Sequence, residues 1–291
     1  MDVALRVLGS GSGGNGSLLR LGDEYLMIDM GFGPRSTASR LSGSGVQLDQ
    51  IKHAILTHLD RDHFRPSWFR SILKHRINVH CHERHVHALY RNIAAHSADQ
   101  HANILRRENL LHVFGDNALS IPFTQTTLSI HHIPLAHDEN GTRGFIIHAD
   151  EYRIAYATDL GHVPDTLVTG FTDCDLIALE CNYDRQLQLE SDRPQVLIRR
   201  VMGKAGHLSN DQSFAALQAI FARSTHRYPQ HVVLLHLSRD CNQPRIVTDL
   251  FKSNRAISER LHLSCQDQPT PWLKLTTAAN ACTGDQMLLF G

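Results

Sequence analysis

Short apolar runs alternate with polar or glycine-rich stretches along the chain, which is the pattern of β-strands joined by turns. Two of these runs are apolar at successive positions and predict buried strands, at Asp175–Glu180 and His231–Leu237. The earlier runs predict strands at Val3–Leu8, Ser17–Leu21, Tyr25–Asp29, Ile51–Thr57, Leu110–Phe114, Thr126–Pro134, Gly144–His148 and Arg153–Thr158.

Helical periodicity appears twice between Thr57 and Leu110, twice between Glu180 and His231, and once after Leu237. Pro66 and Pro244 stand at start positions, and Ser209 or Asn210 supplies an N-cap. The predicted helices are Pro66–Leu73, Glu83–Ala95, Asp192–Met202, Asn210–Ala222 and Pro244–Arg260. This order predicts an α/β fold, a four-layer αββα sandwich of two mixed β-sheets packed face to face with helices outside. We expect residues 1–276 to form this hydrolase domain and residues 277–291 a C-terminal tail.

Composition narrows the class of protein. The chain has 291 residues, 42% of them apolar, and equal numbers of acidic and basic residues, which excludes a generally polybasic nucleic-acid coat but permits a local basic groove. Its six cysteines are scattered without a C-x-x-C pair, and no signal peptide or membrane-spanning run is expected. We therefore expect a cytoplasmic protein with reduced thiols and no membrane contact. The count of 21 histidines draws attention to metal binding.

The segment 11–16, GSGGNG, matches the glycine pattern of dinucleotide-binding loops. That chemistry needs a helix directly after the glycines, whereas residues 17–29 predict a hairpin. We therefore interpret the segment as a loop between two strands. Its backbone amides, together with Ser10 and Ser12, are candidates to border an anionic pocket.

The strongest chemical signal follows the strand that ends near Thr57. The next loop carries His58, Asp60, Asp62 and His63. Alternate side chains of such a segment converge on one point, and the final Asp-His pair turns toward a second point. This density of ligands predicts two divalent metal ions a few ångströms apart, an arrangement that activates a shared hydroxide.

This loop resembles the H-x-H-x-D-H signature of the metallo-β-lactamase superfamily. The resemblance implies three further ligands at the ends of later apolar runs. It assigns His137 to the first metal, Asp159 as a carboxylate that bridges both metals, and His236 to the second metal.

Six blocks of sequence also resemble the YycJ (WalJ, VicX) branch of that superfamily, which is related to tRNase Z and RNase J. Members of this branch are described as 5′–3′ DNA exonucleases, so the resemblance implies a nuclease. The blocks are Val7–Asn15, Ile28–Gly31, Pro134–Asp138, Leu179–Asp184, Gly206–Asn210 and His236–Asp240.

Asp60 departs from the family signature, which has histidine at this position. A carboxylate is a harder ligand of shorter reach than imidazole, so it favours manganese or iron over zinc. We expect Asp60 to bind the first metal, although loss of that metal site is the alternative.

The predicted mechanism is hydrolysis by a hydroxide that Asp62 and Asp159 help to hold. His207 precedes a predicted helix, and we expect it to protonate the leaving oxygen or bind a non-bridging one; a helix cap is the alternative. Catalytic roles therefore fall to Asp62 and His207. Candidate substrate-binding residues are Ser10, Ser12, Asn182, Tyr183, Ser209, Asn210, Ser238 and Arg239.

Two groups of basic residues are candidates to follow a nucleic-acid backbone, with solvated helix faces as the alternative. One group precedes His207 (Arg193, Arg199, Arg200 and Lys204), and the other follows the metal loop (Arg61, Arg65, Arg70, Lys74 and Arg76).

The sequence thus predicts a metal-dependent phosphodiesterase or nuclease whose cofactors are two divalent ions of zinc, manganese or iron and whose substrate is nucleic acid. One alternative is hydrolysis of a small ester, thioester or lactone on the same metal pair, which would not need His207 or the arginines. Another is a non-catalytic regulator with a degraded metal site. Arginines around the metal pocket would favour the nuclease, whereas apolar side chains closing it would favour the small substrate. The sequence does not determine the oligomeric state.

Overall fold

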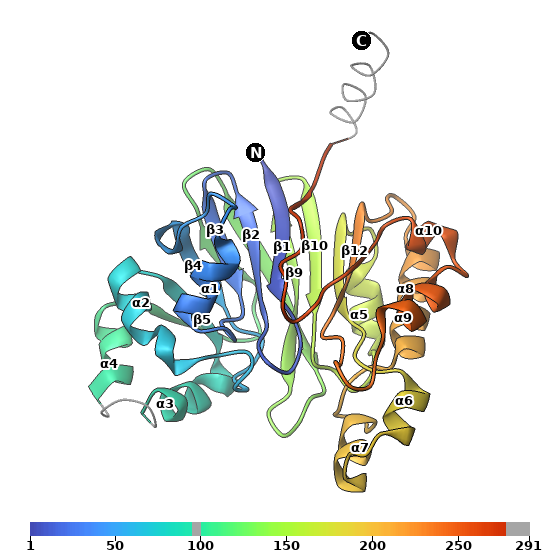
Figure 1. Cartoon of the computed structure of the whole chain (residues 1–291). Helices are drawn as coiled ribbons and strands as arrows, with labels where there is room; N and C mark the ends of the chain where they lie inside the picture. Colours follow the sequence, from blue (N-terminus) through green and yellow to red (C-terminus); the bar gives the residue numbers. More distant parts are fainter. Residues whose placement is uncertain (95–99, 278–291) are drawn as a thin grey trace.

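The computed structural model describes residues 1–94 and 100–277, and within them two seven-stranded sheets pack face to face (Figure 1). The first sheet has the order β14 (Leu273–Lys274), β1 (Val3–Gly9), β2 (Gly16–Leu21), β3 (Glu24–Ile28), β4 (Ile51–Ile55), β5 (Asn78–His82) and β6 (Leu111–Phe114). The second has the order β13 (Leu261–Leu263), β12 (His231–Leu235), β11 (Leu176–Glu180), β10 (Tyr152–Ala157), β9 (Thr142–Ala149), β8 (Thr127–Leu135) and β7 (Leu119–Pro122).

Both sheets are mixed, as the sequence predicts. In the first sheet β1, β2 and β3 pair antiparallel, whereas β3 to β6 run parallel. In the second, β7 to β10 are antiparallel and β10 to β13 parallel. The parallel strands end on the same side of each sheet, so the loops that follow them gather at one end of the sandwich.

Alternation along the strands divides the apolar side chains between two layers. Leu19 and Leu26 lie in the core between the sheets, whereas Leu18 and Met27 face the helices outside the first sheet. All four are fully buried. Each such side chain contributes about 1.5–3 kcal/mol to folding.

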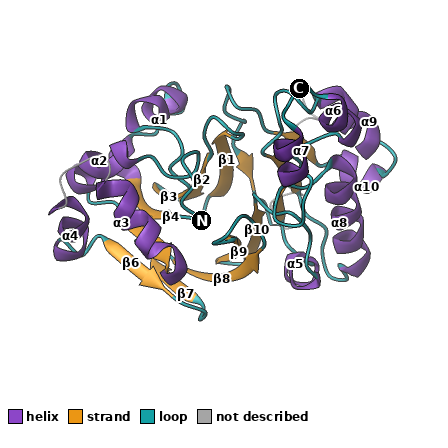
Figure 2. Ribbon diagram, turned by 90° about the horizontal axis from the view of Figure 1, so that it is seen from below, coloured by secondary structure: helices purple, strands orange, loops and turns teal. Residues whose placement is uncertain are grey.

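Helices cover the outer face of each sheet and complete the predicted four layers (Figure 2). Those against the first sheet are α1 (Pro34–Leu41), α2 (Phe69–His75), α3 (Val86–Ala94) and α4 (Gln100–Arg107). Those against the second are α5 (Asp165–Phe171), α8 (Asn210–Arg223), α9 (Pro244–Phe251) and α10 (Arg255–Ser258). Two short helices, α6 (Arg185–Glu190) and α7 (Gln195–Val201), lie beyond the end of the second sheet. Three 3₁₀ turns span Leu48–Gln50, Pro66–Trp68 and Glu83–His85.

Several predicted boundaries were wrong. The predicted helix Pro244–Arg260 is two helices, because Asn254 accepts a hydrogen bond from the backbone N–H of Ile257 and starts α10 afresh. Strand β5 was not predicted, because histidines occupy its alternate positions where apolar residues were expected. Helices α1, α4, α5 and α6 and strands β7, β13 and β14 were also missed. Apart from Thr277, the predicted tail 277–291 lies outside the described residues.

A row of histidines lies across β4, β5 and β6. His53 and His80 stack with ring centroids 5.2 Å apart, and His80 and His112 with centroids 5.0 Å apart. Nδ1 of His53 lies 3.0 Å from Nε2 of His80, within hydrogen-bonding distance. Burial lowers the pKa of His53 to about 4 and that of His80 to about 2. Both side chains are therefore neutral in the folded chain at neutral pH.

This row makes the chain's stability depend on pH. A histidine in the unfolded chain takes up a proton near pH 6.5, whereas folded His80 does not until about pH 2. The free energy of unfolding should therefore fall as the pH drops below about 6.5, with His80 alone accounting for about 2 kcal/mol by about pH 5. We expect His80→Gln to lose less stability than wild type between those pH values in urea unfolding. The exposed control His87→Gln should keep the wild-type dependence, and equal slopes in all three proteins would contradict the expectation.

None of the helices in the described part of the chain is long and apolar enough to cross a membrane.

Candidate metal centre

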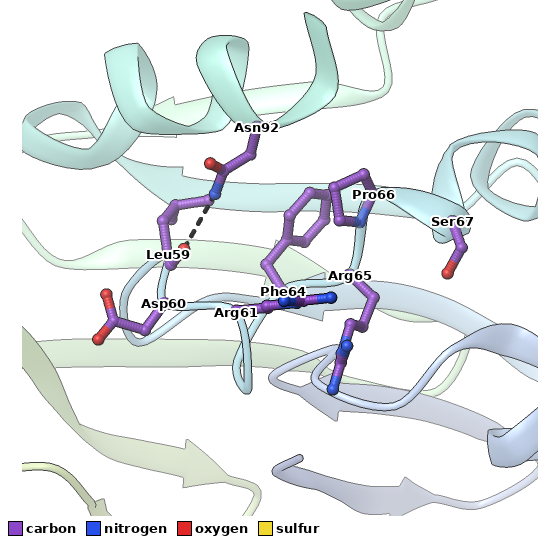
Figure 3. A pocket seen from close by; sticks show the side chains of 8 residues that line it. All are labelled: Leu59, Asp60, Arg61, Phe64, Arg65, Pro66, Ser67 and Asn92. Carbon is purple, nitrogen blue, oxygen red and sulfur yellow. Dashed lines mark hydrogen bonds between the residues drawn. The ribbon is translucent and has the colours of Figure 1, made fainter. Parts of the chain in front are cut away.

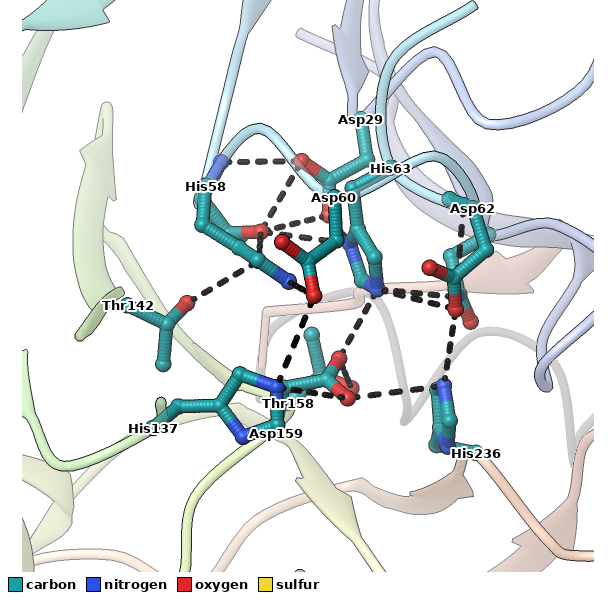
Figure 4. A network of polar contacts seen from close by, with 12 residues as sticks. Asp29, His58, Asp60, Asp62, His63, His137, Thr142, Thr158, Asp159 and His236 are labelled. Carbon is teal, nitrogen blue, oxygen red and sulfur yellow. Dashed lines mark hydrogen bonds and ion pairs between the residues drawn. The ribbon is translucent and has the colours of Figure 1, made fainter. Parts of the chain in front are cut away.

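Seven polar side chains from four segments meet at the end of the sandwich where the parallel strands finish (Figure 4). The loop after β4 supplies four of them, and the ends of β8, β10 and β12 supply one histidine, one aspartate and one histidine. Asp159 and His236, as well as nearby Asp29, have left-handed backbone conformations with φ of 57°, 58° and 61°. Non-glycine residues rarely adopt this conformation, and it is concentrated at functional sites.

His58, Asp60 and His137 form the first group. Oδ2 of Asp60 lies 3.8 Å from Nε2 of His58 and 4.0 Å from Nε2 of His137. The Asp60 side chain is about half exposed, whereas both histidines are buried. Burial raises the pKa of Asp60. The three ligand atoms lie close enough together to hold one metal ion.

Asp62, His63 and His236 form the second group. Oδ2 of Asp62 lies 3.7 Å from Nε2 of His63 and 3.4 Å from Nε2 of His236. These three atoms also satisfy the spacing of a metal site.

Asp159 lies between the two groups. Its Oδ2 is 2.8 Å from Nε2 of His63, and its Oδ1 is 3.5 Å from Nε2 of His236. The same Oδ1 is 4.0 Å from Nε2 of His137 in the first group. One carboxylate therefore faces ligands of both groups, which is the position of a bridging ligand.

A buried layer behind the loop fixes its side chains. Asp29 is fully buried, and its carboxylate lies 2.8 Å from Nδ1 of His63 and accepts hydrogen bonds from the backbone N–H and the hydroxyl of Thr57. A carboxylate behind a metal-ligating histidine orients the ring and raises its basicity. Gly31 packs so tightly here that a Cβ would stand 1.7 Å from the carbonyl oxygen of Asp62. The sequence analysis gave no role to Asp29, whose only signal was its place in the Ile28–Gly31 block.

Contacts at Nδ1 also orient the rings of His137 and His236. Nδ1 of His137 lies 3.0 Å from the carbonyl oxygen of Gly206, to which it donates a hydrogen bond. Nδ1 of His236 lies 2.8 Å from the side-chain amide nitrogen of Asn182, which also donates to the carbonyl oxygen of His236. These contacts hold the rings with Nε2 toward the centre of the site.

Charges in the site perturb one another strongly. Burial opposes protonation of His63, but the carboxylates of Asp159 and Asp29 outweigh it and raise its pKa well above the ordinary value. Against the same burial penalty, Asp159 raises the pKa of His236 to about 9. Burial would raise the pKa of Asp159, but His236 and His63 hold it well below its usual range. The carboxylates therefore favour positive charge on their neighbours, which is the electrostatic setting that attracts divalent cations.

The residues present fit a pair of divalent metal ions. Nε2 of His58 is buried and has no hydrogen-bond partner among the described residues, although it lies beside Asp60. Burial and the neighbouring His63 lower the pKa of His58 well below its ordinary value, which leaves the imidazole neutral, as a metal ligand requires. Imidazole nitrogens mixed with carboxylate oxygens suit zinc, manganese and iron.

His207 lies at the edge of the site rather than within either group. Its Nδ1 is 2.6 Å from Oε1 of Glu180, and its ring stacks on His236 with centroids 5.2 Å apart. Glu180 is fully buried, and its Oε2 accepts a hydrogen bond from the backbone N–H of Leu160 at 2.9 Å. Glu180 and His207 also have the spacing of a metal site together with Asp159 and His236. Both carboxylate oxygens of Glu180 already accept hydrogen bonds, however, so we interpret Glu180 as the partner of His207. The sequence analysis missed Glu180, which ends β11 inside the Leu179–Asp184 block.

A cavity of about 380 Å³ opens beside His207, and we call it the His207 cavity. His137 and His236 form part of its wall, as do Arg193 and Arg200. Arg193 pairs with Asp240 at 2.8 Å, and Arg200 pairs with Asp138. Leu197 and Val201 add apolar surface.

The structure places only three of the eight predicted substrate-binding residues on this cavity: Ser12, Asn182 and Ser238. The hydroxyl of buried Ser10 accepts the backbone N–H of His236 and donates to Asn15. Ser209 caps α8, as predicted for this helix start, by accepting the N–H of Gln212.

The remaining three also lie away from the cavity. Tyr183 is buried in an apolar cluster with Val201, and Asn210 is buried and bonded to Asn242. Arg239 pairs with Asp267 at the surface. The sequence analysis assigned these residues to the substrate, but in the structure their side chains contact other parts of the protein.

One further group has metal-like spacing: His82, Asp116 and His132. Nδ1 of His82 accepts the backbone N–H of Arg84, which leaves the ring proton on Nε2, the nitrogen that faces Asp116. That tautomer does not ligate a metal through Nε2.

The chain is similar in sequence to known proteins. The model of a family described as beta-lactamase superfamily domain matches residues 25–236. Exodeoxyribonuclease YycJ of Bacillus anthracis is 22% identical over 246 residues, which cover 84% of this chain and 86% of the relative.

Solved structures share the fold. The metallo-beta-lactamase fold protein YhfI from Bacillus subtilis has a TM-score of 0.63 at 15% identity, over 93% of this chain and 99% of the other. Human tRNase Z, short form, has a TM-score of 0.59 at 15% identity, over 93% of this chain and 99% of the other.

Proposed function

Because this chain belongs to the beta-lactamase superfamily, we propose that it is a metal-dependent hydrolase that cleaves phosphodiester bonds of nucleic acid. The likeness to an exodeoxyribonuclease over most of both chains supports DNA as the substrate and a strand end as the place of cleavage. Two divalent metal ions would be its cofactors, and the two groups described above, with Asp159 between them, would hold these ions.

The observation that carries this proposal is the pair of ligand groups joined by Asp159 beside a cavity with two arginines. A phosphodiester needs its negative charge neutralised at the reacting phosphate, and guanidinium groups bind phosphate oxygens in a bidentate manner. Arg193 and Arg200 supply such groups in the cavity that His137 and His236 also line.

The residues of the site divide the work of hydrolysis. When bound, the two metal ions supply Lewis-acid stabilisation of phosphoryl charge and lower the pKa of water. His58, Asp60 and His137 would hold the first ion, and Asp62, His63 and His236 the second. Asp62, which is only partly buried, lies where it can also accept a hydrogen bond from the attacking water. His207 lines the cavity and is held through Nδ1 by Glu180, which leaves its other nitrogen free to protonate the leaving oxygen.

The same features argue against the alternatives. A site for a small apolar ester would not need two arginines on the cavity wall or the partly buried pair of Glu180 and His207. The position of Asp60 argues against a regulator with a degraded metal site, because its carboxylate lies within metal-site spacing of His58 and His137.

A direct test incubates the metal-loaded protein with single-stranded DNA, double-stranded DNA, RNA and bis-p-nitrophenyl phosphate. We expect cleavage of the small diester and of DNA, with mononucleotides released from a strand end. Hydrolysis of thioesters or lactones without any cleavage of phosphodiesters would contradict the proposal.

Asp60 sets the metal preference of the first group. Replacing imidazole by a carboxylate adds negative charge and a hard oxygen donor, so the wild-type protein should work best with manganese or iron. We expect Asp60→His to shift the preference toward zinc without loss of the fold, since the side chain is half exposed. The measurement is elemental analysis and activity after apo-protein is reconstituted with each metal. If Asp60→Ala binds and uses metals as wild type does, Asp60 is not a ligand.

A further inference from the structure

Candidate metal ligands line two separate cavities. The His207 cavity adjoins a second cavity of about 200 Å³, with which it shares His137 and Asp138. We call this second space the His85 cavity, after one of the histidines that line it. It adjoins in turn a third cavity of about 510 Å³, with which it shares Leu59, Asp60 and Asn92. This third space, the Phe64 cavity, is lined by the loop after β4 and the start of the following helical turn (Figure 3).

Charge differs between the two sides of the metal centre. In the His207 cavity each arginine is paired with an aspartate. On the other side, Arg61 and Arg65 line the Phe64 cavity and Arg91 lines the His85 cavity. These three form no ion pair with any described residue. Arg65 is anchored, because its guanidinium donates to the carbonyl oxygens of Gly31 and Gly13 at 2.9 and 3.1 Å.

The His85 cavity also contains a buried polar side chain without a partner. His85 is 1% exposed, its Nε2 is buried, and neither ring nitrogen hydrogen bonds to a described residue. A buried polar group without a hydrogen bond costs about 1–3 kcal/mol, so such a group is expected to meet a ligand or water. Asp60 and Asn140 are further polar residues in the wall of this cavity.

We infer that the His85 and Phe64 cavities bind the phosphates of a single-stranded nucleic acid on the far side of the scissile bond from the His207 cavity. Arg61 and Arg91 contact these phosphates, and His85 positions the one next to the metal centre. Because neighbouring cavities share lining residues, a strand that follows all three passes Asp60 and His137, and the unpaired guanidiniums supply the attraction for its backbone. This inference rests on the proposed function, because it assigns the substrate a path through the same site.

The test compares kcat/KM of metal-loaded protein on a single-stranded oligonucleotide and on bis-p-nitrophenyl phosphate at several salt concentrations. We expect Arg61→Ala and Arg91→Ala each to lower kcat/KM on the oligonucleotide about tenfold more than on the small diester. Each should also reduce the slope of log kcat/KM against log salt by about 0.7, the value for one phosphate contact to a single strand.

Two further variants make the test specific. His85→Gln keeps a hydrogen-bond donor of similar reach and should lose less on the oligonucleotide than His85→Ala. Arg245→Ala removes an exposed arginine of α9 that lines none of the three cavities, and it should keep the wild-type salt slope.

If the arginine variants keep the wild-type slope while oligonucleotides are still cleaved, the path is wrong and the proposed function stands. The path is equally wrong if Arg245→Ala loses as much slope as they do. If metal-loaded wild type cleaves neither substrate, the proposed function itself fails.

Discussion

Replacing Asp159 by asparagine is expected to lower kcat/KM on phosphodiesters by about 10³-fold or more. Asn has the size of Asp and tolerates the left-handed backbone at this position, so the fold should be kept. The charge that faces His63, His137 and His236 is lost, however. A loss of about 4 kcal/mol of charge stabilisation in the transition state corresponds to this factor.

The measurement is kcat/KM on bis-p-nitrophenyl phosphate together with metal content. Asp150→Asn is the matched control, because Asp150 also has a left-handed backbone, with φ of 52°, but lies in the turn between β9 and β10. The control should retain wild-type activity and metal. If Asp159→Asn binds two metals and turns over at the wild-type rate, Asp159 does not bridge the site.

Replacing His207 by alanine is expected to lower kcat by about 10²–10⁴-fold and to leave both metals bound. Burial opposes protonation of His207, but Glu180 outweighs it and raises its pKa above the ordinary value. The raised pKa keeps the His207 ring protonated to higher pH than a free imidazole, which favours its donating a proton to a leaving oxygen. Its contribution should disappear as the pH rises through that raised pKa.

Glu180→Gln separates the role of proton donor from a structural one. Removing the carboxylate takes away the main cause of the raised pKa, so the alkaline limb of the pH–rate profile should move to lower pH. A substrate with a good leaving group, such as p-nitrophenolate, should be less sensitive to His207→Ala than DNA is. Equal losses on both substrates, or an unshifted limb in Glu180→Gln, would assign His207 a structural role.

The sequence predicted the layers of the fold because strand and helix periodicities are local. It also singled out the ligand loop, since His58 to His63 directly follow a buried strand. The later ligands His137, Asp159 and His236 came from a resemblance, and the structure brings all of them to one place. Their roles as ligands stay predictions.

Other parts of the site depend on contacts between distant residues, which no local pattern reveals. Asp29 meets His63 from 34 positions away, and Glu180 meets His207 from 27 positions away. Tyr183 was assigned to the substrate because it follows a strand, but it turns into an apolar cluster. Strand β5 was missed for a related reason: its histidines are buried by stacking against neighbouring strands, not by apolar character.

The central claim is that two metal ions at this site make the chain a phosphodiesterase. Its most direct test measures metal stoichiometry and cleavage of single-stranded DNA on one preparation: as purified, after chelation, and after metal is restored. We predict two ions per chain, loss of cleavage on chelation, and recovery that follows occupancy of the second ion. Full cleavage by metal-free protein, or two bound ions without cleavage of any phosphodiester, would contradict the account.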